Sequence, residues 1–266
     1  MYYSINDAMY WYEVHGEGVP VVLLHGFTGS TSTWKNFTKF AEGFRLITVD
    51  LPGHGKTKIH TPRNMEECCN DIELLFRSIG LDSFHLLGYS MGGRTALSYA
   101  IMHPGGVRSL ILESASPGLS EEKDRNKRIK NDEQLAKKIE KEGIRAFVDF
   151  WGNIPMFASQ KELSPEVQQE IRQERLSQSE EGLSMSLRYM GTGKQPSWWE
   201  HLPSMRIPVL LLVGERDEKF IQINKKMQKL LISCKLKICE QAGHAVHVEK
   251  PDIFGKLVTS FMKDNT

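Results

Sequence analysis

The chain has 266 residues, and 34 Lys and Arg stand against 33 Asp and Glu, which gives a formal net charge of +1 at pH 7. Hydrophobic residues make up 40% of the chain and charged residues 25%, as in an ordinary globular protein long enough for one large domain. This balance excludes a basic surface for nucleic acid, and apolar runs such as residues 19–24 and 207–213 are too short to cross a bilayer.

Strand-like and helix-like segments alternate along most of the chain. Six short aliphatic runs predict strands at residues 19–25, 44–50, 84–88, 107–114, 207–214 and 236–240. Helical patterns lie between and after these runs, at residues 31–42, 65–80, 91–103, 220–232 and 251–263. Because continuous apolar runs suit strands that are buried on both faces, we expect an open, mostly parallel α/β sheet flanked by helices.

The alternation stops between residues 116 and 200, where the chain is charged, helical in pattern and without a convincing strand. Ser164 and Pro165 predict the start of one of these helices, with Ser164 as the N-cap. A connection of about 85 residues is far longer than an ordinary loop. We therefore expect a core formed by residues 1–115 and 201–266, with residues 116–200 as a helical cap over the carboxyl edge of the sheet.

A serine lies at the junction of a predicted strand and a predicted helix. The segment Gly88-Tyr89-Ser90-Met91-Gly92 has the G-x-S-x-G pattern in the strand–turn–helix context of a nucleophile elbow. The N-terminus of the following helix favours negative charge near the serine oxygen. A tight turn with a capping serine has the same pattern, but this context favours Ser90 as a catalytic serine.

A catalytic serine requires a base and a group that orients the base. Asp217 follows the predicted strand 207–214 at the spacing Gly-x-x-Asp, which favours it over Glu215 and Glu218 as the acid. His244 lies in a Gly-His turn after the last predicted strand and is the expected base, whereas His247 is expected to support the site or to pack. The chain order serine, acid, histidine is the order that a nucleophile elbow of this kind predicts.

The loop LHGFTGS at residues 24–30 ends the first predicted parallel strand. An elbow places the backbone N–H of the residue after the serine, here Met91, near the reacting oxygen. The loop can supply a second N–H from Phe27, and the two donors would form an oxyanion hole. The alternative is that His25 and Gly26 only end a strand.

The cysteines and histidines indicate no metal centre. Cys68, Cys69, Cys234 and Cys239 form no Cys-x-x-Cys pair, and reduced thiols in a cytoplasmic protein are expected. His244 and His247 have the spacing of metal ligands, but no carboxylate or cysteine completes a cluster. The N-terminus has no basic stretch followed by an apolar run, so no secretion signal is expected.

Five segments together resemble the α/β-hydrolases: LHGFTGS (24–30), DLPGHG (50–55), GYSMGG (88–93), GERD (214–217) and AGHAVHVEKP (242–251). The resemblance covers the whole chain. It implies an α/β-hydrolase fold with a helical cap, no cofactor and a cytoplasmic location. Hydrolysis, lyase chemistry and ligand binding are all known on this fold, so the fold alone does not choose among them.

Arg94 lies four residues after Ser90, so both side chains share one face of the predicted helix. A salt bridge to a neighbouring loop is one explanation. Because Arg binds carboxylates through two parallel hydrogen bonds, a substrate with several carboxylates is the other. The predicted cap adds two further arginines, Arg128 and Arg175, and the alternative for each is that it lies on a solvated helix face. Tyr89 and Trp151 each carry a polar group on an aromatic ring and could also contact such a substrate.

The longer motifs GYSMGGR (88–94), RIKND (128–132), DFW (149–151) and GERDEKF (214–220) are similar to those of the 2-succinyl-6-hydroxy-2,4-cyclohexadiene-1-carboxylate synthases of menaquinone biosynthesis. This resemblance implies elimination of pyruvate from a tricarboxylate, started by removal of a ring proton. It implies a triad of Ser90, Asp217 and His244 in which Ser90 acts as the base. The implied substrate-binding residues are Tyr89, Arg94, Arg128, Trp151 and Arg175.

Two other functions remain open at this point. The first is a serine hydrolase that cleaves a carboxylated ester or a carbon–carbon bond, with Ser90 as nucleophile. The second is a binding protein of the hydrolase fold without turnover, against which the intact serine, histidine and acid argue. We expect a small-molecule polycarboxylate ligand and neither a nucleic-acid nor a membrane partner, and the sequence predicts no oligomeric state.

Overall fold

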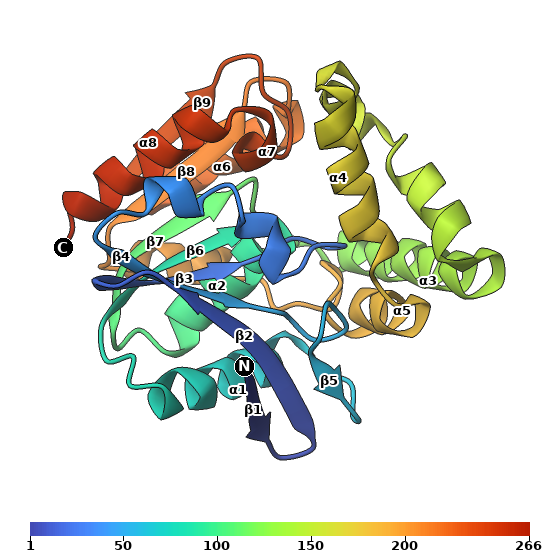
Figure 1. Ribbon diagram of the computed structural model, residues 1–266, viewed down its shortest axis with the longest axis horizontal. Helices are drawn as coiled ribbons and strands as arrows, with labels where there is room; N and C mark the ends of the chain where they lie inside the picture. Colours follow the sequence, from blue (N-terminus) through green and yellow to red (C-terminus); the bar gives the residue numbers. More distant parts are fainter.

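The computed structural model describes all residues, 1–266, and is built around one nine-stranded sheet (Figure 1). The strands are β1 (Tyr2–Ile5), β2 (Ala8–His15), β3 (Val19–Leu24), β4 (Phe44–Val49), β5 (Lys58–Ile59), β6 (Phe84–Tyr89), β7 (Val107–Glu113), β8 (Val209–Gly214) and β9 (Cys234–Cys239). Their order in the sheet is β1-β2-β4-β3-β6-β7-β8-β9, and β5 pairs with β2. The strands from β4 to β9 in this order are all parallel, so the predicted α/β architecture is confirmed.

The N-terminal part of the sheet was not predicted from the sequence. β1, β2 and β5 pair in antiparallel fashion, and β2 joins them to β4. In β2 only Ala8 and Tyr10 are buried, and the rest of the strand is partly or fully exposed. Such a half-covered edge strand lacks the continuous apolar run by which the inner strands were found.

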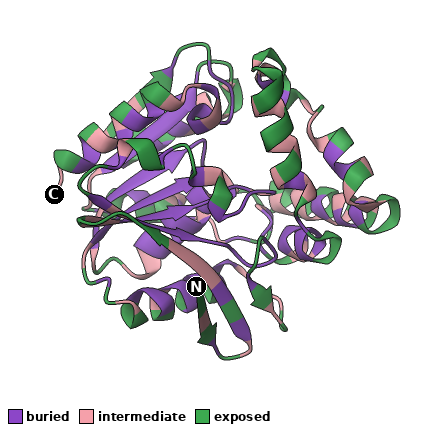
Figure 2. Ribbon diagram, viewed as in Figure 1, coloured by how far each residue is buried: buried purple, intermediate pink, exposed green.

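Helices cover both faces of the sheet. They are α1 (Met65–Ser78), α2 (Met91–Met102), α6 (Glu218–Leu230), the short α7 (Val246–Glu249) and α8 (Pro251–Lys263). α1, α2 and α6 contribute to one apolar core, and α8 packs on the opposite face with the segment that contains Trp34 and Phe37. Figure 2 shows the inner strands buried between these helices, whose outer faces are exposed.

The helix predicted at residues 31–42 was wrong. The segment forms two 3₁₀ helices, η1 (Thr31–Trp34) and η2 (Thr38–Phe40). Ser30 Oγ accepts a hydrogen bond from the N–H of Ser32, and Thr33 Oγ1 accepts one from the N–H of Ser30. Hydroxyl groups that bind nearby backbone compete with α-helical hydrogen bonds, which explains the tighter turns.

Residues between β7 and β8 form the helical layer seen at the right of Figure 1. It consists of α3 (Glu122–Trp151), η3 (Pro155–Glu162), α4 (Pro165–Leu176) and α5 (Glu180–Tyr189), followed by η4 (Trp199–Ser204). Ser164 caps α4 as predicted, and its hydroxyl accepts the N–H of Val167. α3 and α5 share a small apolar core of their own, formed by Ala136, Ile139, Phe147, Val148, Leu183 and Leu187. The boundaries 116 and 200 for this cap stay a prediction.

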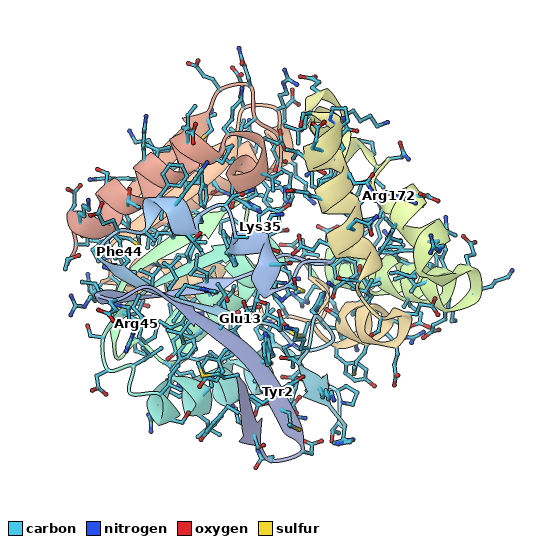
Figure 3. All side chains as sticks on the ribbon, viewed as in Figure 1. Tyr2, Glu13, Lys35, Phe44, Arg45 and Arg172 are labelled. Atoms are coloured by element: carbon cyan, nitrogen blue, oxygen red, sulfur yellow. The ribbon has the colours of Figure 1, made fainter.

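Polar contacts attach α4 to the segment of the core that contains η1. Glu174 Oε1 accepts hydrogen bonds from the hydroxyls of Ser30, Ser32 and Thr33, at 3.1, 2.9 and 2.7 Å. Lys35 Nζ, on the core side of this contact, lies 2.9 Å from a carboxylate oxygen of Glu170; Figure 3 labels Lys35 and also Arg172 on α4. Every helix in the structure is too short or too polar to span a lipid bilayer.

Candidate active site

Ser90, His244 and Asp217 come together at the carboxyl edge of the parallel strands. His244 Nε2 lies 3.0 Å from Ser90 Oγ, and His244 Nδ1 lies 2.6 Å from Asp217 Oδ2. Ser90 follows β6, Asp217 follows β8 and His244 follows β9. Since the carboxyl ends of parallel strands meet at one edge, three distant segments contribute to one hydrogen-bonded chain. The geometry is that of a serine oxygen activated by a base that an acid orients.

The turn that carries Ser90 is strained in the way that an elbow requires. Ser90 has φ 50° and ψ −104°, an uncommon backbone conformation for a residue with a side chain. The flanking glycines are needed for space, because a Cβ on Gly88 would lie 2.2 Å from the oxygen of Gly92. A Cβ on Gly92 would lie 2.1 Å from the oxygen of Leu24. The elbow thus packs directly against the end of β3 and the loop that follows it.

That loop brings the predicted oxyanion-hole residues to the site. Phe27 and Met91 both line the cavity that contains Ser90. His25 fixes the base of the loop, because its Nε2 accepts the N–H of Leu51 at 3.0 Å while its Nδ1 lies 2.8 Å from the oxygen of Gly26. Burial lowers the pKa of His25 to about 4, so the ring is neutral and can make both bonds. The role of the two N–H groups as an oxyanion hole stays a prediction.

The imidazole of His244 is enclosed by aromatic rings. The centroids of Phe220, Tyr89 and Phe157 lie 4.8, 5.5 and 6.1 Å from that of His244. Only 1% of the His244 side chain is exposed, against 10% for that of Asp217. The proton-transfer groups therefore lie away from bulk water, where electrostatic interactions are stronger.

A cavity of about 580 Å³ opens over Ser90 between the core and the cap. α6 contributes Lys219, Ile223 and Lys226 to its lining, and α3 contributes a second group of lining residues. The charged residues that line the cavity are five cations and one acid, namely Arg94, Lys127, Arg128, Lys219, Lys226 and Asp124. A cavity of this size suits a small molecule, and its excess of positive charge favours an anion.

Arg94 lines this cavity, as Ser90 does. Its Nη1 donates to Gln195 Oε1 at 2.6 Å and to the main-chain oxygen of Met190 at 3.0 Å. Neither acceptor is charged, so Arg94 does not form the salt bridge that was the alternative explanation for this residue. Its guanidinium is a cation without a carboxylate partner beside Ser90.

Arg128 and Trp151, from α3, also line the cavity. Arg128 Nε lies 2.7 Å from Asp132 Oδ1, so this arginine is partly neutralised within its own helix. Trp151 Nε1 is buried and has no hydrogen-bond partner. Its ring packs against Phe27, with the centroids 5.5 Å apart. Both residues are placed to contact a bound molecule, and this role stays a prediction.

Tyr89 and Arg175 do not line the cavity over Ser90. They line a smaller cavity of about 50 Å³, and Phe27 lines both cavities. Arg175 is buried there, donates to Gln160 Oε1 at 3.0 Å and lies 4.5 Å from the ring of Phe157. The structure thus separates two of the five expected substrate-binding residues from the other three.

Several lining residues were missed in the sequence. Lys219 and Lys226 lie seven residues apart on α6, a spacing that places both on one helical face. Burial, followed in effect by the charge of Arg128, lowers the pKa of Lys219, while Asp217 raises it.

No three His, Cys, Asp or Glu side chains converge in a way that would hold a metal ion.

The fold, the elbow and the hydrogen-bonded serine, histidine and aspartate define a protein of the α/β-hydrolase class, and comparison with known proteins gives the same result. Residues 19–251 match the protein family whose description is "alpha/beta hydrolase fold". An esterase from Thermogutta terrifontis, solved with malate bound, is 26% identical with a TM-score of 0.85, over 97% of this chain and 95% of that chain.

Other relatives narrow the family. A Bacillus subtilis protein with the provisional name 2-succinyl-6-hydroxy-2,4-cyclohexadiene-1-carboxylate synthase is 43% identical, over 91% of this chain and 89% of its own. A solved structure of MenH from S. aureus is 38% identical with a TM-score of 0.91, over 98% of this chain and 99% of that chain. Within the α/β-hydrolases, the chain belongs to the 2-succinyl-6-hydroxy-2,4-cyclohexadiene-1-carboxylate synthase family.

Proposed function

We propose that the protein eliminates pyruvate from 2-succinyl-5-enolpyruvyl-6-hydroxy-3-cyclohexene-1-carboxylate to give 2-succinyl-6-hydroxy-2,4-cyclohexadiene-1-carboxylate. The observation that carries the proposal is the relative at 43% identity over 91% of this chain, whose name is that of the product-forming synthase. The cationic cavity over Ser90 is consistent with a substrate that bears three carboxylates.

In this mechanism Ser90 acts as a base and not as a nucleophile. His244 Nε2, 3.0 Å from Ser90 Oγ, accepts the serine proton, and Asp217 holds the ring in the required tautomer. Ser90 Oγ then takes the ring proton of the substrate. The electron pair of the broken C2–H bond forms the C2–C3 double bond, and the C3–C4 double bond shifts to C4–C5. The C5–O bond then breaks, and pyruvate leaves as its enolate, which takes up the proton held on His244.

The cavity stabilises the charge that develops during this step. The N–H groups of Phe27 and Met91 would donate to the oxygen on which negative charge accumulates. Arg94 would seat a carboxylate next to the base, and Arg128 would bind another from the cap. Preorganised donors and cations in a site that excludes water cost no reorganisation when the charge appears. Tyr89 and Arg175 stay predicted contacts that we assign from the family resemblance alone.

A serine hydrolase acting on a carboxylated ester or a carbon–carbon bond is the second candidate. It is favoured by one observation, namely that the esterase from Thermogutta terrifontis shares the fold at a TM-score of 0.85. The hydrogen-bonded chain from Ser90 through His244 to Asp217 serves a nucleophile as well as a base. The cation at Arg94 argues against a hydrolase of simple esters, which have no carboxylate to seat, and pyruvate release separates the lyase from a hydrolase of carboxylated esters.

The decisive experiment is incubation of the purified protein with the enolpyruvyl tricarboxylate while pyruvate is measured. Catalytic release of pyruvate that requires Ser90 would support the proposal. Turnover of chromogenic esters without pyruvate release would instead identify a hydrolase, and the absence of both activities with retained ligand binding would identify a binding protein.

A further inference from the structure

The segment that carries His244 is held by two buried carboxylates to which neither the triad nor the substrate contacts assign a role. The first is Glu249, at the end of α7. Its Oε2 accepts the N–H of Gly243 at 2.6 Å, and its Oε1 accepts the N–H of Ala245 at 3.4 Å. The backbone N–H groups of the two residues that flank His244 are therefore bound to one side chain.

The second carboxylate is that of Glu113, the last residue of β7. Glu113 has no exposed surface. Its main-chain oxygen accepts the N–H of Ser90 at 2.8 Å. Its side-chain Oε1 accepts the N–H of His247 at 3.0 Å, and both side-chain oxygens lie 2.9 Å from His247 Nδ1. One residue thus contacts the elbow of the serine through its backbone and the segment of the histidine through its side chain.

Carboxylates are unfavourable in a protein interior unless hydrogen bonds compensate their desolvation. An apolar side chain would fill the same volume without that cost. Glu249 and Glu113 instead direct their oxygens at backbone N–H groups within three residues of the base. This arrangement fixes the backbone of the segment and not only its packing.

Close packing also restricts the segment that carries His244. A Cβ on Gly243 would lie 2.1 Å from Ser159 Oγ of the cap, so the backbone there is in close contact with η3. The ring of His247 packs against Trp34 and Tyr89, with centroids 5.1 and 4.6 Å away. Loss of the Glu249 hydrogen bonds would therefore act on the loop that sets the distance between His244 and Ser90.

We propose that Glu249 is a positioning residue for the base His244, and that Glu113 anchors the same segment to the elbow of Ser90. Glu249 binds the N–H groups of the residues before and after His244, so that Nε2 remains 3.0 Å from Ser90 Oγ and Nδ1 remains 2.6 Å from Asp217. Misplacement of a reacting group by about 1 Å can lower a rate about 100-fold. The inference concerns the geometry of the triad and holds for a lyase and for a hydrolase.

The test compares Glu249→Gln with the matched control Glu215→Gln. The amide nitrogen of the introduced glutamine cannot accept a hydrogen bond, so one of the two N–H groups beside His244 loses its acceptor. Glu215 Oε2 accepts the N–H of Gln241 at 2.9 Å, in the same loop but two residues before Gly243. Both variants remove one charged acceptor from one backbone N–H, and only the first acts next to the base.

We expect Glu249→Gln to lower kcat roughly 10- to 100-fold with KM changed less than about two-fold, because the base is displaced while the binding residues are untouched. It should also slow the labelling of Ser90 by a fluorophosphonate, which requires no natural substrate. The far-downfield proton signal of the His244–Asp217 hydrogen bond should shift. Glu215→Gln should leave all three measurements unchanged.

Normal kcat, normal labelling and an unshifted proton signal in Glu249→Gln would overturn the proposal. So would an equal loss in both variants, since it would show a general effect on the loop. Should Glu249→Gln fail to fold, Glu249→Asp keeps the charge, shortens the reach and carries the same expectation. The labelling and proton measurements remain decisive even if the wild-type protein releases no pyruvate, which separates this inference from the proposed function.

Discussion

Arg94 in α2 donates a hydrogen bond of 2.6 Å to Gln195, in the segment between α5 and η4, and thereby connects the core to the cap beside Ser90. Gln195 is neutral, as is the second acceptor, the main-chain oxygen of Met190. Burial, with a smaller effect from Arg128, lowers the pKa of Arg94 to about 9, so the guanidinium remains charged at pH 7. The charge of Asp132 raises this pKa, but the Asp132 carboxylate pairs with Arg128 and not with Arg94. The guanidinium of Arg94 is therefore available to an anionic ligand.

The first prediction concerns Arg94→Met, which keeps much of the stem and removes the charge. A charge-assisted hydrogen bond contributes about 1.5–3 kcal/mol, so kcat/KM for the tricarboxylate should fall roughly 10- to 100-fold. A small neutral ester, if it is turned over, should lose much less. Gln195→Met is the control, since it removes the same hydrogen bond and keeps the cation. If Arg94→Met lowers Tm and both activities alike, and Gln195→Met does the same, the role of Arg94 is structural.

The second prediction concerns the triad. Ser90→Ala, Asp217→Asn and His244→Ala should each lower kcat roughly 10²- to 10⁴-fold, because each removes one member of a continuous hydrogen-bonded chain. The three losses should not add in double variants, since the residues act as a unit. Steady-state pyruvate release on folded variants checks this. Near-normal turnover by Ser90→Ala would remove the serine from the mechanism.

The third prediction separates elimination from hydrolysis. If Ser90 acts as a base, no covalent adduct should form on it, and no oxygen from solvent should enter the products during turnover in ¹⁸O-labelled water. Mass spectrometry of the protein and the products checks both points. A burst of product together with an adduct on Ser90 would establish a nucleophilic serine instead.

The fourth prediction concerns stability at low pH. His54 is buried, and this lowers its pKa from about 6.5 to about 3, with a further effect from His25. Between these values the unfolded chain binds a proton that the folded protein does not, so stability falls as the pH drops below about 6.5. Between pH 7 and pH 5 this effect amounts to roughly 2 kcal/mol.

His54→Asn should remove that part of the pH dependence, because the Asn amide can still donate to the oxygen of Pro52, which lies 3.1 Å from His54 Nδ1. His60→Asn is the control, since His60 is exposed. Denaturant unfolding at pH 7 and pH 5 measures the difference for each variant. An unchanged pH dependence in His54→Asn would show that His54 is already protonated or does not titrate in this range.

The sequence by itself determined the parallel sheet and the order of the serine, the acid and the histidine along the chain. Continuous apolar runs, such as the one in β8, mark strands that are covered on both faces, and such strands hardly depend on context. Ser90 and Asp217 follow the fully buried strands β6 and β8, and His244 follows the edge strand β9, which is only partly covered. Since parallel strands end at one edge, strand order together with local motifs was enough to bring the three residues together. β1 and β2 gave no such signal, because antiparallel strands at the border of a sheet are only half covered.

Only the tertiary structure decided which side chains surround the serine. Lys219 and Lys226 of α6 line the same cavity as residues of α3, whereas Arg175 lines a separate, smaller cavity. The orientation of a helix relative to the sheet depends on packing between distant segments, which local periodicity does not encode. For the same reason the contacts of Glu113 and Glu249 could not be predicted from the sequence. An acid at the end of an aliphatic strand was visible in the sequence, but its partner His247 lies 134 residues away, and only the folded chain brings the two together.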